Sequence, residues 1–171
     1  AGVYAFQAKD MDRANKYIDV AMKDTAAYKD ALNLKLYIMQ QGLKTKEDSV
    51  KYVNTLRDLY AKDANNEQIF SNLVTLCGSL KMTSEQDKLL NDKLAADPTN
   101  ALAWALKGQI EMNANKPAEA VECYKKSIAK DGKNVIVLTY LGFCLNAQAA
   151  KDGVSKAEQQ KLYKESEGYL E

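Results

Sequence analysis

Residues 97–134 read DPTNALAWALKGQIEMNANKPAEAVECYKKSIAKDGKN, and this stretch decides the fold. It opens with Asp97-Pro98-Thr99-Asn100 and closes with Asp131-Gly132-Lys133-Asn134, two copies of an Asp-x-x-Asn frame. A third copy, Asp63-Ala64-Asn65-Asn66, precedes them, and the interval from Asp63 to Asp97 equals the interval from Asp97 to Asp131. A fixed period of about 20 to 50 residues is the signature of stacked structural repeats. We therefore expect an array built from one repeated unit.

Each frame combines a helix stop with a helix start. Pro98 cannot continue a helix, Gly132 tolerates the left-handed conformation that ends one, and the closing Asn can cap the next. A second break falls inside each unit and is followed by helix-start signals, namely Thr45-x-x-Asp48, Thr83-x-x-Gln86 and Pro117. Each unit is therefore predicted to be a pair of helices.

Bulky apolar residues recur at the same interval as the frames, at Leu36, Phe70, Trp104 and Leu138. The chain has only 8 Gly and 2 Pro and is rich in Ala, Leu, Lys, Glu and Gln, which favours helices. One helix pair cannot bury its apolar face alone, so neighbouring pairs are expected to stack around a continuous core. The fold class predicted from the residues is all-α.

The unit at 101–134 resembles the tetratricopeptide repeat family. Trp104, Gly108, Ala120 and Tyr124 stand where that family places an aromatic, two small residues and a second aromatic. The resemblance implies a right-handed α-solenoid of antiparallel helix pairs, with the small residues allowing the two helices of a pair to approach closely. Lys107 and Glu111 stand where the family has apolar residues. In the first helix of this unit, Leu106 and Ile110 are therefore the alternative candidates for the buried stripe.

With this register, residues 1–171 are predicted to form a single array. The predicted units are a partial repeat at 1–28, repeats at 29–66, 67–100 and 101–134, and a final repeat at 135–171 that contains an insertion. Asp152-Gly153 and Ser155-x-x-Glu158 are expected to open the last helix. Both ends of the array are predicted to be open, and end-to-end self-association is a hypothesis that follows.

Composition excludes several classes of function. The chain has no His, and its three Cys, at 77, 123 and 144, are far apart, so we expect buried thiols, no metal site and no catalytic triad. No phosphate-binding glycine motif is present, and no cofactor is predicted. The formal net charge is +1, and the longest uncharged run is too short for a membrane span, so neither nucleic acid nor membrane insertion is expected.

Charge divides unevenly between the two helices of each predicted unit. The first helices carry few charged residues, and the second helices carry many. In tetratricopeptide arrays the first helices line the concave side, so the resemblance implies a groove. The predicted groove residues are Leu34, Tyr37, Gln41, Gln68, Ser71, Thr75, Leu102, Ala105, Gln109, Met112, Ile136, Thr139 and Phe143. A purely structural alternative is that first helices are flanked on both sides and therefore need apolar residues.

The predicted function is a non-catalytic scaffold that binds a peptide segment or a partner protein in this groove. Family members that grip a terminal carboxylate use Lys, Arg and Asn on successive first helices, and here only Asn72 fits, so no such clamp is expected. An alternative is an accessory module of a larger enzyme or of a secretion or envelope assembly; an RNA-binding helical repeat is less favoured because the inner face is neutral. Because the chain begins at Ala1 without Met or a signal-peptide pattern, we expect a processed or excised piece whose compartment is not readable.

Overall fold

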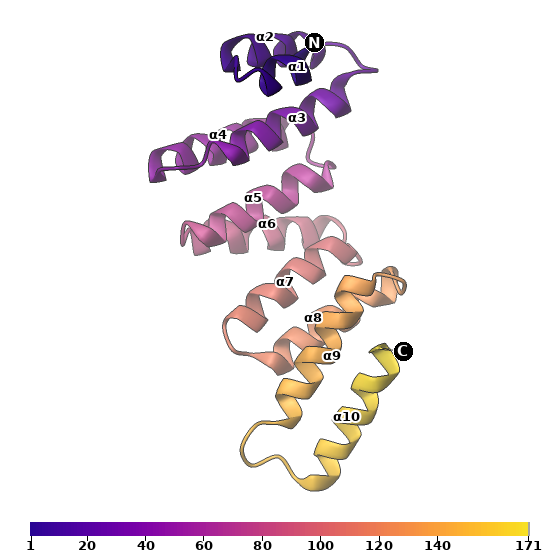
Figure 1. The fold of residues 1–171 in the computed structure, drawn as a ribbon. Coiled ribbons are helices and arrows are strands. Elements are labelled where there is room, and N and C mark those ends of the chain that lie inside the picture. Colours follow the sequence, from indigo (N-terminus) through magenta and orange to yellow (C-terminus); the bar gives the residue numbers. More distant parts are fainter. Residues whose placement is uncertain (171) are drawn as a thin grey trace. The chain divides into compact units, whose positions relative to one another are not determined.

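The computed structural model describes residues 1–170, and ten helices account for most of them (Figure 1). No strand occurs in this part of the chain. The helices are α1 (Gly2–Gln7), α2 (Met11–Ala21), α3 (Tyr28–Gln41), α4 (Lys46–Lys62), α5 (Glu67–Ser79), α6 (Thr83–Ala96), α7 (Ala101–Asn113), α8 (Pro117–Lys130), α9 (Val135–Ala149) and α10 (Lys156–Leu170). The predicted all-α array of helix pairs is confirmed.

The chain divides into two compact units, with the boundary inside α4. In the first, residues 1–58, α2 packs against both α1 and α3. Its core contains Ala14, Ile18, Ala31 and Ile38, and the half-buried Leu34 packs against them. The N-terminal stretch is therefore a folded helix pair.

The second unit, from residue 59 onward, contains three helix pairs in chain order, α5/α6, α7/α8 and α9/α10. Each pair packs internally, and α7 also contacts α5 and α6, while α8 contacts α9. One core cluster centres on Phe70, Val74 and Leu106, and another centres on Tyr124 and Leu141. Stacking of successive pairs is thus what buries the apolar residues of this unit.

Asparagine caps begin the first helices of the second unit. The side chains of Asn66, Asn100 and Asn134 accept hydrogen bonds from the backbone N–H groups three residues later, at 3.1, 2.8 and 3.2 Å. Pro117 is the first residue of α8. These contacts satisfy backbone donors that would otherwise lack partners, which explains why the Asn recurs at the repeat period.

Replacing Asn100 by Ala is expected to lower the free energy of unfolding by about 1 kcal/mol, because the cap of α7 is lost. Asn100→Asp is the matched control, since a carboxylate accepts the same bond and interacts favourably with the helix N-terminus. Urea denaturation followed by circular dichroism measures both. Equal stability of the Ala and Asp variants would show that the side chain does not cap the helix.

Capping elsewhere follows the sequence prediction in two places and departs from it in one. At the start of α4, the Thr45 hydroxyl donates to Asp48 at 2.8 Å, and the Asp48 N–H donates back to Thr45 Oγ1 at 3.1 Å. Before α10, Ser155 Oγ accepts from the Glu158 N–H at 3.3 Å. The box predicted at Thr83 is wrong, because Thr83 is already helical and Met82 is the cap residue, with no side-chain bond.

Among the described residues of the second unit, the buried polar side chains are Gln86, Ser127 and Ser166, and each connects a second helix to the first helix of its own pair. Gln86 Nε2 donates to the Val74 carbonyl at 2.9 Å, Ser127 Oγ to the Ala101 carbonyl at 2.8 Å, and Ser166 Oγ to the Gly142 carbonyl at 3.0 Å. These bonds satisfy groups that would be costly to bury alone, so they help fix how each pair packs.

Candidate protein-binding surface

All thirteen predicted groove residues lie on first helices, and none is buried. Leu34, Tyr37 and Gln41 are on α3 in the first unit; we call them the α3 stripe. The other ten are in the second unit and form what we call the α5–α7–α9 stripe. They are Gln68, Ser71 and Thr75 on α5, Leu102, Ala105, Gln109 and Met112 on α7, and Ile136, Thr139 and Phe143 on α9.

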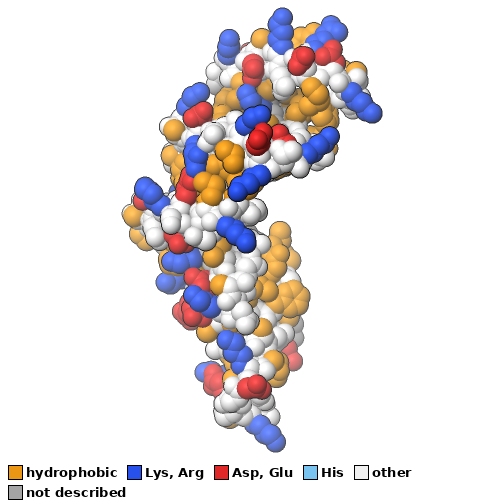
Figure 2. All heavy atoms as spheres, turned by 90° about the vertical axis from the view of Figure 1, so that its left-hand side faces the viewer, with side chains coloured by type: hydrophobic (Ala, Val, Ile, Leu, Met, Phe, Trp, Pro, Cys, Tyr) orange, Lys and Arg blue, Asp and Glu red, His pale blue; other side chains and the backbone are white. Residues whose placement is uncertain are grey.

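The α5–α7–α9 stripe leaves large apolar side chains in solvent. Ile136 is 68% exposed, Phe143 52% and Met112 36%. The stripe contains no ionisable residue, and α9 contains none except the weakly acidic Tyr140 and Cys144. Where the second unit is visible in Figure 2, apolar side chains gather along one edge and many charged ones lie along the opposite edge. Clustered apolar exposure of this kind favours a contact surface.

Some stripe residues also have a structural role. The half-buried Leu102 packs against the Phe70 core cluster, and Ala105 packs against the Tyr124 cluster. The Thr139 hydroxyl donates to the Val135 carbonyl of its own helix at 2.8 Å. In the first unit, the Tyr37 ring contacts the Phe6 ring edge-on, with centroids 5.8 Å apart. Phe143 is therefore a better residue for a binding test by substitution than these four residues, whose replacement would also disturb the fold.

The two charged residues of α7 lie outside the stripe and have partners. Lys107 Nζ lies 5.6 Å from the centroid of the Trp104 ring, and Glu111 pairs with Lys116 at 3.5 Å. Leu106 is buried and Ile110 is half-buried against the Phe70 cluster. Leu106 and Ile110 thus supply the buried stripe of α7. This is the alternative that the sequence analysis raised because Lys107 and Glu111 depart from the family pattern.

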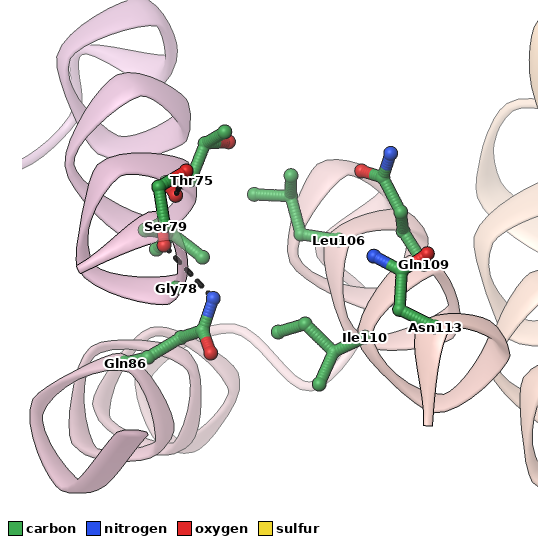
Figure 3. A pocket seen from close by; sticks show the side chains of 9 residues that line it. Thr75, Gly78, Ser79, Gln86, Leu106, Gln109, Ile110 and Asn113 are labelled. Carbon is green, nitrogen blue, oxygen red and sulfur yellow. Dashed lines mark hydrogen bonds between the residues drawn. The ribbon is translucent and has the colours of Figure 1, made fainter. Parts of the chain in front are cut away.

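A pocket of about 270 Å³ lies where α5, α6 and α7 meet (Figure 3). It brings together Thr75 and Gln109 of the stripe with residues that the sequence analysis did not select. The lining residues are Val74, Thr75, Gly78, Ser79, Gln86, Leu106, Gln109, Ile110 and Asn113. We call it the α5–α6–α7 pocket. Its size suits one side chain of a partner better than a complete small-molecule ligand.

Gln86 is the main residue that the sequence analysis missed, because it was assigned to a helix cap. A signal was available: Gln86 occupies the same position in its repeat as Ala120, which is fully buried, so the repeat register places Gln86 inward. The structure shows it 7% exposed and bonded to α5. Its side chain points into the space between α5 and α7 in Figure 3.

A second pocket, of about 330 Å³, lies beside the starts of α5, α7 and α9. Leu102 and Ala105 of the stripe share it with Glu67, Ala101, Asp131 and Asn134. Four of the ten predicted groove residues of the second unit therefore line a pocket, two at each end of α7.

The described residues, 1–170, also bear on metal sites, membrane spans and reactive thiols. These residues contain no cluster of three or more candidate metal ligands, and none of their helices is long and apolar enough to cross a membrane. The three Cys residues are buried and form no disulfide. Burial raises the pKa of the Cys123 and Cys144 thiols, which disfavours the reactive thiolate.

Comparison with solved structures identifies the type of fold. Two structures titled as MamA match with TM-scores of 0.61 and 0.58 and sequence identities of 16% and 15%. Each match covers 98% of this chain, and the matches cover 93% and 87% of the MamA chains. The chain has a tetratricopeptide-like helical repeat fold. No protein-family model and no curated protein sequence matches it.

Proposed function

We propose that the chain is a non-catalytic scaffold that binds a segment of another protein along the α5–α7–α9 stripe. The observation that supports this most is the uncharged surface on which Met112, Ile136 and Phe143 remain exposed beside amide and hydroxyl side chains. Apolar side chains of a partner would bury this area, and Gln and Thr side chains would bond to its backbone. The tetratricopeptide-like fold is consistent with such a role.

The α3 stripe is proposed to add contacts through Tyr37, which is 49% exposed. The thirteen groove residues include no Lys or Arg, so the proposed ligand is an internal extended or helical segment and not a chain terminus held by its carboxylate. End-to-end association of the chain is a separate proposal. Light scattering that shows a monomer at all concentrations would refute it.

Replacing Phe143 by Ala should weaken partner binding about tenfold, or ~1.4 kcal/mol, because an exposed aromatic anchor is lost. The measurement is affinity capture from the source cells with the intact chain, followed by titration of the recovered partner. Tyr37→Ala, alone and combined with Phe143→Ala, tests the α3 stripe.

Tyr163→Ala is the matched control, since Tyr163 is a 43% exposed aromatic on the second helix α10. It should leave binding unchanged, and all variants should keep the wild-type helicity. Equal binding by the wild type and the Phe143 variants would show that the partner binds elsewhere than on the stripe. An equal loss of binding in Tyr163→Ala would show the same.

A further inference from the structure

Gln86 has more hydrogen-bonding capacity than its structural role requires. Ser127 and Ser166 tie their helix pairs together with a single hydroxyl, whereas Gln86 does so with a carboxamide. Its Nε2 is fixed by the Val74 carbonyl at 2.9 Å, and Oε1 has no hydrogen-bond partner among the described residues. Because the residue is only 7% exposed, this acceptor is held in place inside the α5–α6–α7 pocket.

The pocket walls combine apolar and neutral polar groups. Val74, Leu106 and Ile110 provide apolar surface, and Gln109 and Asn113 provide side-chain amides on the α7 side. No lining residue is ionisable. A charged occupant would therefore lose its hydration without meeting a counter-charge, and a wholly apolar occupant would leave the Gln86 oxygen and the amides unpaired.

Gly78 makes room for this arrangement. A Cβ atom built on Gly78 would collide with Nε2 of the Gln86 carboxamide and would lie 3.2 Å from its Cδ. Any larger residue at position 78 would thus push Gln86 away from Val74 and into the pocket. The glycine allows the carboxamide to lie against α5 while the space beside it stays open.

We propose that the α5–α6–α7 pocket binds the side-chain carboxamide of an Asn or Gln residue in the partner segment. This proposal rests on the proposed function and names the kind of residue that the site selects. The ligand N–H donates to Gln86 Oε1, and its carbonyl accepts from an amide N–H on the α7 wall. A carboxamide carries both a donor and an acceptor and no charge, so it matches the lining better than an acid, an amine or an alkyl group.

The test is a titration of isotope-labelled full chain with N-acetyl-glutamine methylamide, followed by NMR. Saturable shifts are expected at Thr75, Gly78, Gln109 and Asn113. The glutamate analogue and the methionine analogue, which have similar length, should bind at least about tenfold more weakly. Equal affinity for the methionine analogue, or no saturable shift with the glutamine derivative, would overturn the proposal.

Two variants locate the effect. Gln86→Leu replaces the carboxamide with an apolar side chain and so removes the acceptor. Gly78→Ala displaces Gln86 while favouring the helix. Each variant should reduce affinity for the probe about tenfold. Gln160→Leu, at an exposed position on α10, is the control and should bind as the wild type does. Unchanged affinity in Gln86→Leu would also overturn the proposal.

The probe requires no natural partner, so the two proposals can fail separately. Loss of partner capture in Phe143→Ala without any carboxamide preference would refute only the pocket assignment. Carboxamide binding that depends on Gln86, together with partner capture that is insensitive to Phe143, would refute only the stripe.

Discussion

Phe70→Ala is expected to lower the free energy of unfolding by about 3–5 kcal/mol, the largest stability loss predicted for this chain. The Phe70 ring is fully buried in the cluster with Val74, Leu90 and Leu106. It also contacts the Tyr60 ring, with centroids 5.8 Å apart, and Lys93 Nζ lies 5.3 Å from its centroid. Truncation would leave a cavity between α5, α6 and α7, and the three helices cannot close it without moving. Urea denaturation monitored by circular dichroism measures the loss.

Phe143→Ala is the matched control, because it makes the same chemical change at an exposed position on another first helix, α9. Phe143 is 52% exposed, so its truncation should cost less than about 1 kcal/mol. Phe70→Leu, which keeps most of the volume, should lie between the two. If Phe143→Ala destabilised the chain as much as Phe70→Ala, Phe143 would be a core residue and the proposed stripe would lose its main support.

The repeat period predicted most helix boundaries because the same local chemistry recurs at each step. Asn66, Asn100 and Asn134 cap helices wherever they occur, and this bond needs only the backbone three residues ahead. The helical period decides which side chains of α5, α7 and α9 share a face, but the choice of that face as a groove came from the family resemblance and stays a prediction.

The pocket could not be predicted in this way, because it depends on three helices at once. Thr83 and Gln86 have the spacing of a capping box, but burial of the Gln86 carboxamide against Val74 competes with that local bond. The tertiary hydrogen bond forms because Gly78 leaves space on α5. Local motifs carry no information about such a gap; only the register with Ala120 indicates that Gln86 faces inward.

Gly108→Ala is expected to lower the free energy of unfolding by about 2 kcal/mol, although Ala favours helices by about 1 kcal/mol over Gly. A Cβ on Gly108 would lie 2.8 Å from Tyr124 Cε1 and 2.9 Å from Cδ1. The Tyr124 ring cannot move aside easily, because it is 1% exposed and stacks on Tyr140 with centroids 6.0 Å apart. α7 and α8 would therefore have to separate. Thermal and urea denaturation measure the effect.

Gly142→Ala tests whether it is the immobility of the neighbour that matters. A Cβ on Gly142 would lie 2.9 Å from Leu170 Cγ, nearly the same separation as at Gly108. Leu170, however, is 49% exposed at the end of α10, so its side chain can rotate into solvent. The gain in helix propensity should then offset most of the free-energy cost of the close contact with Leu170. The stability of the variant should therefore lie within about 0.5 kcal/mol of the wild type. A loss as large as that of Gly108→Ala would show that α10 is packed too rigidly on α9 for Leu170 to yield.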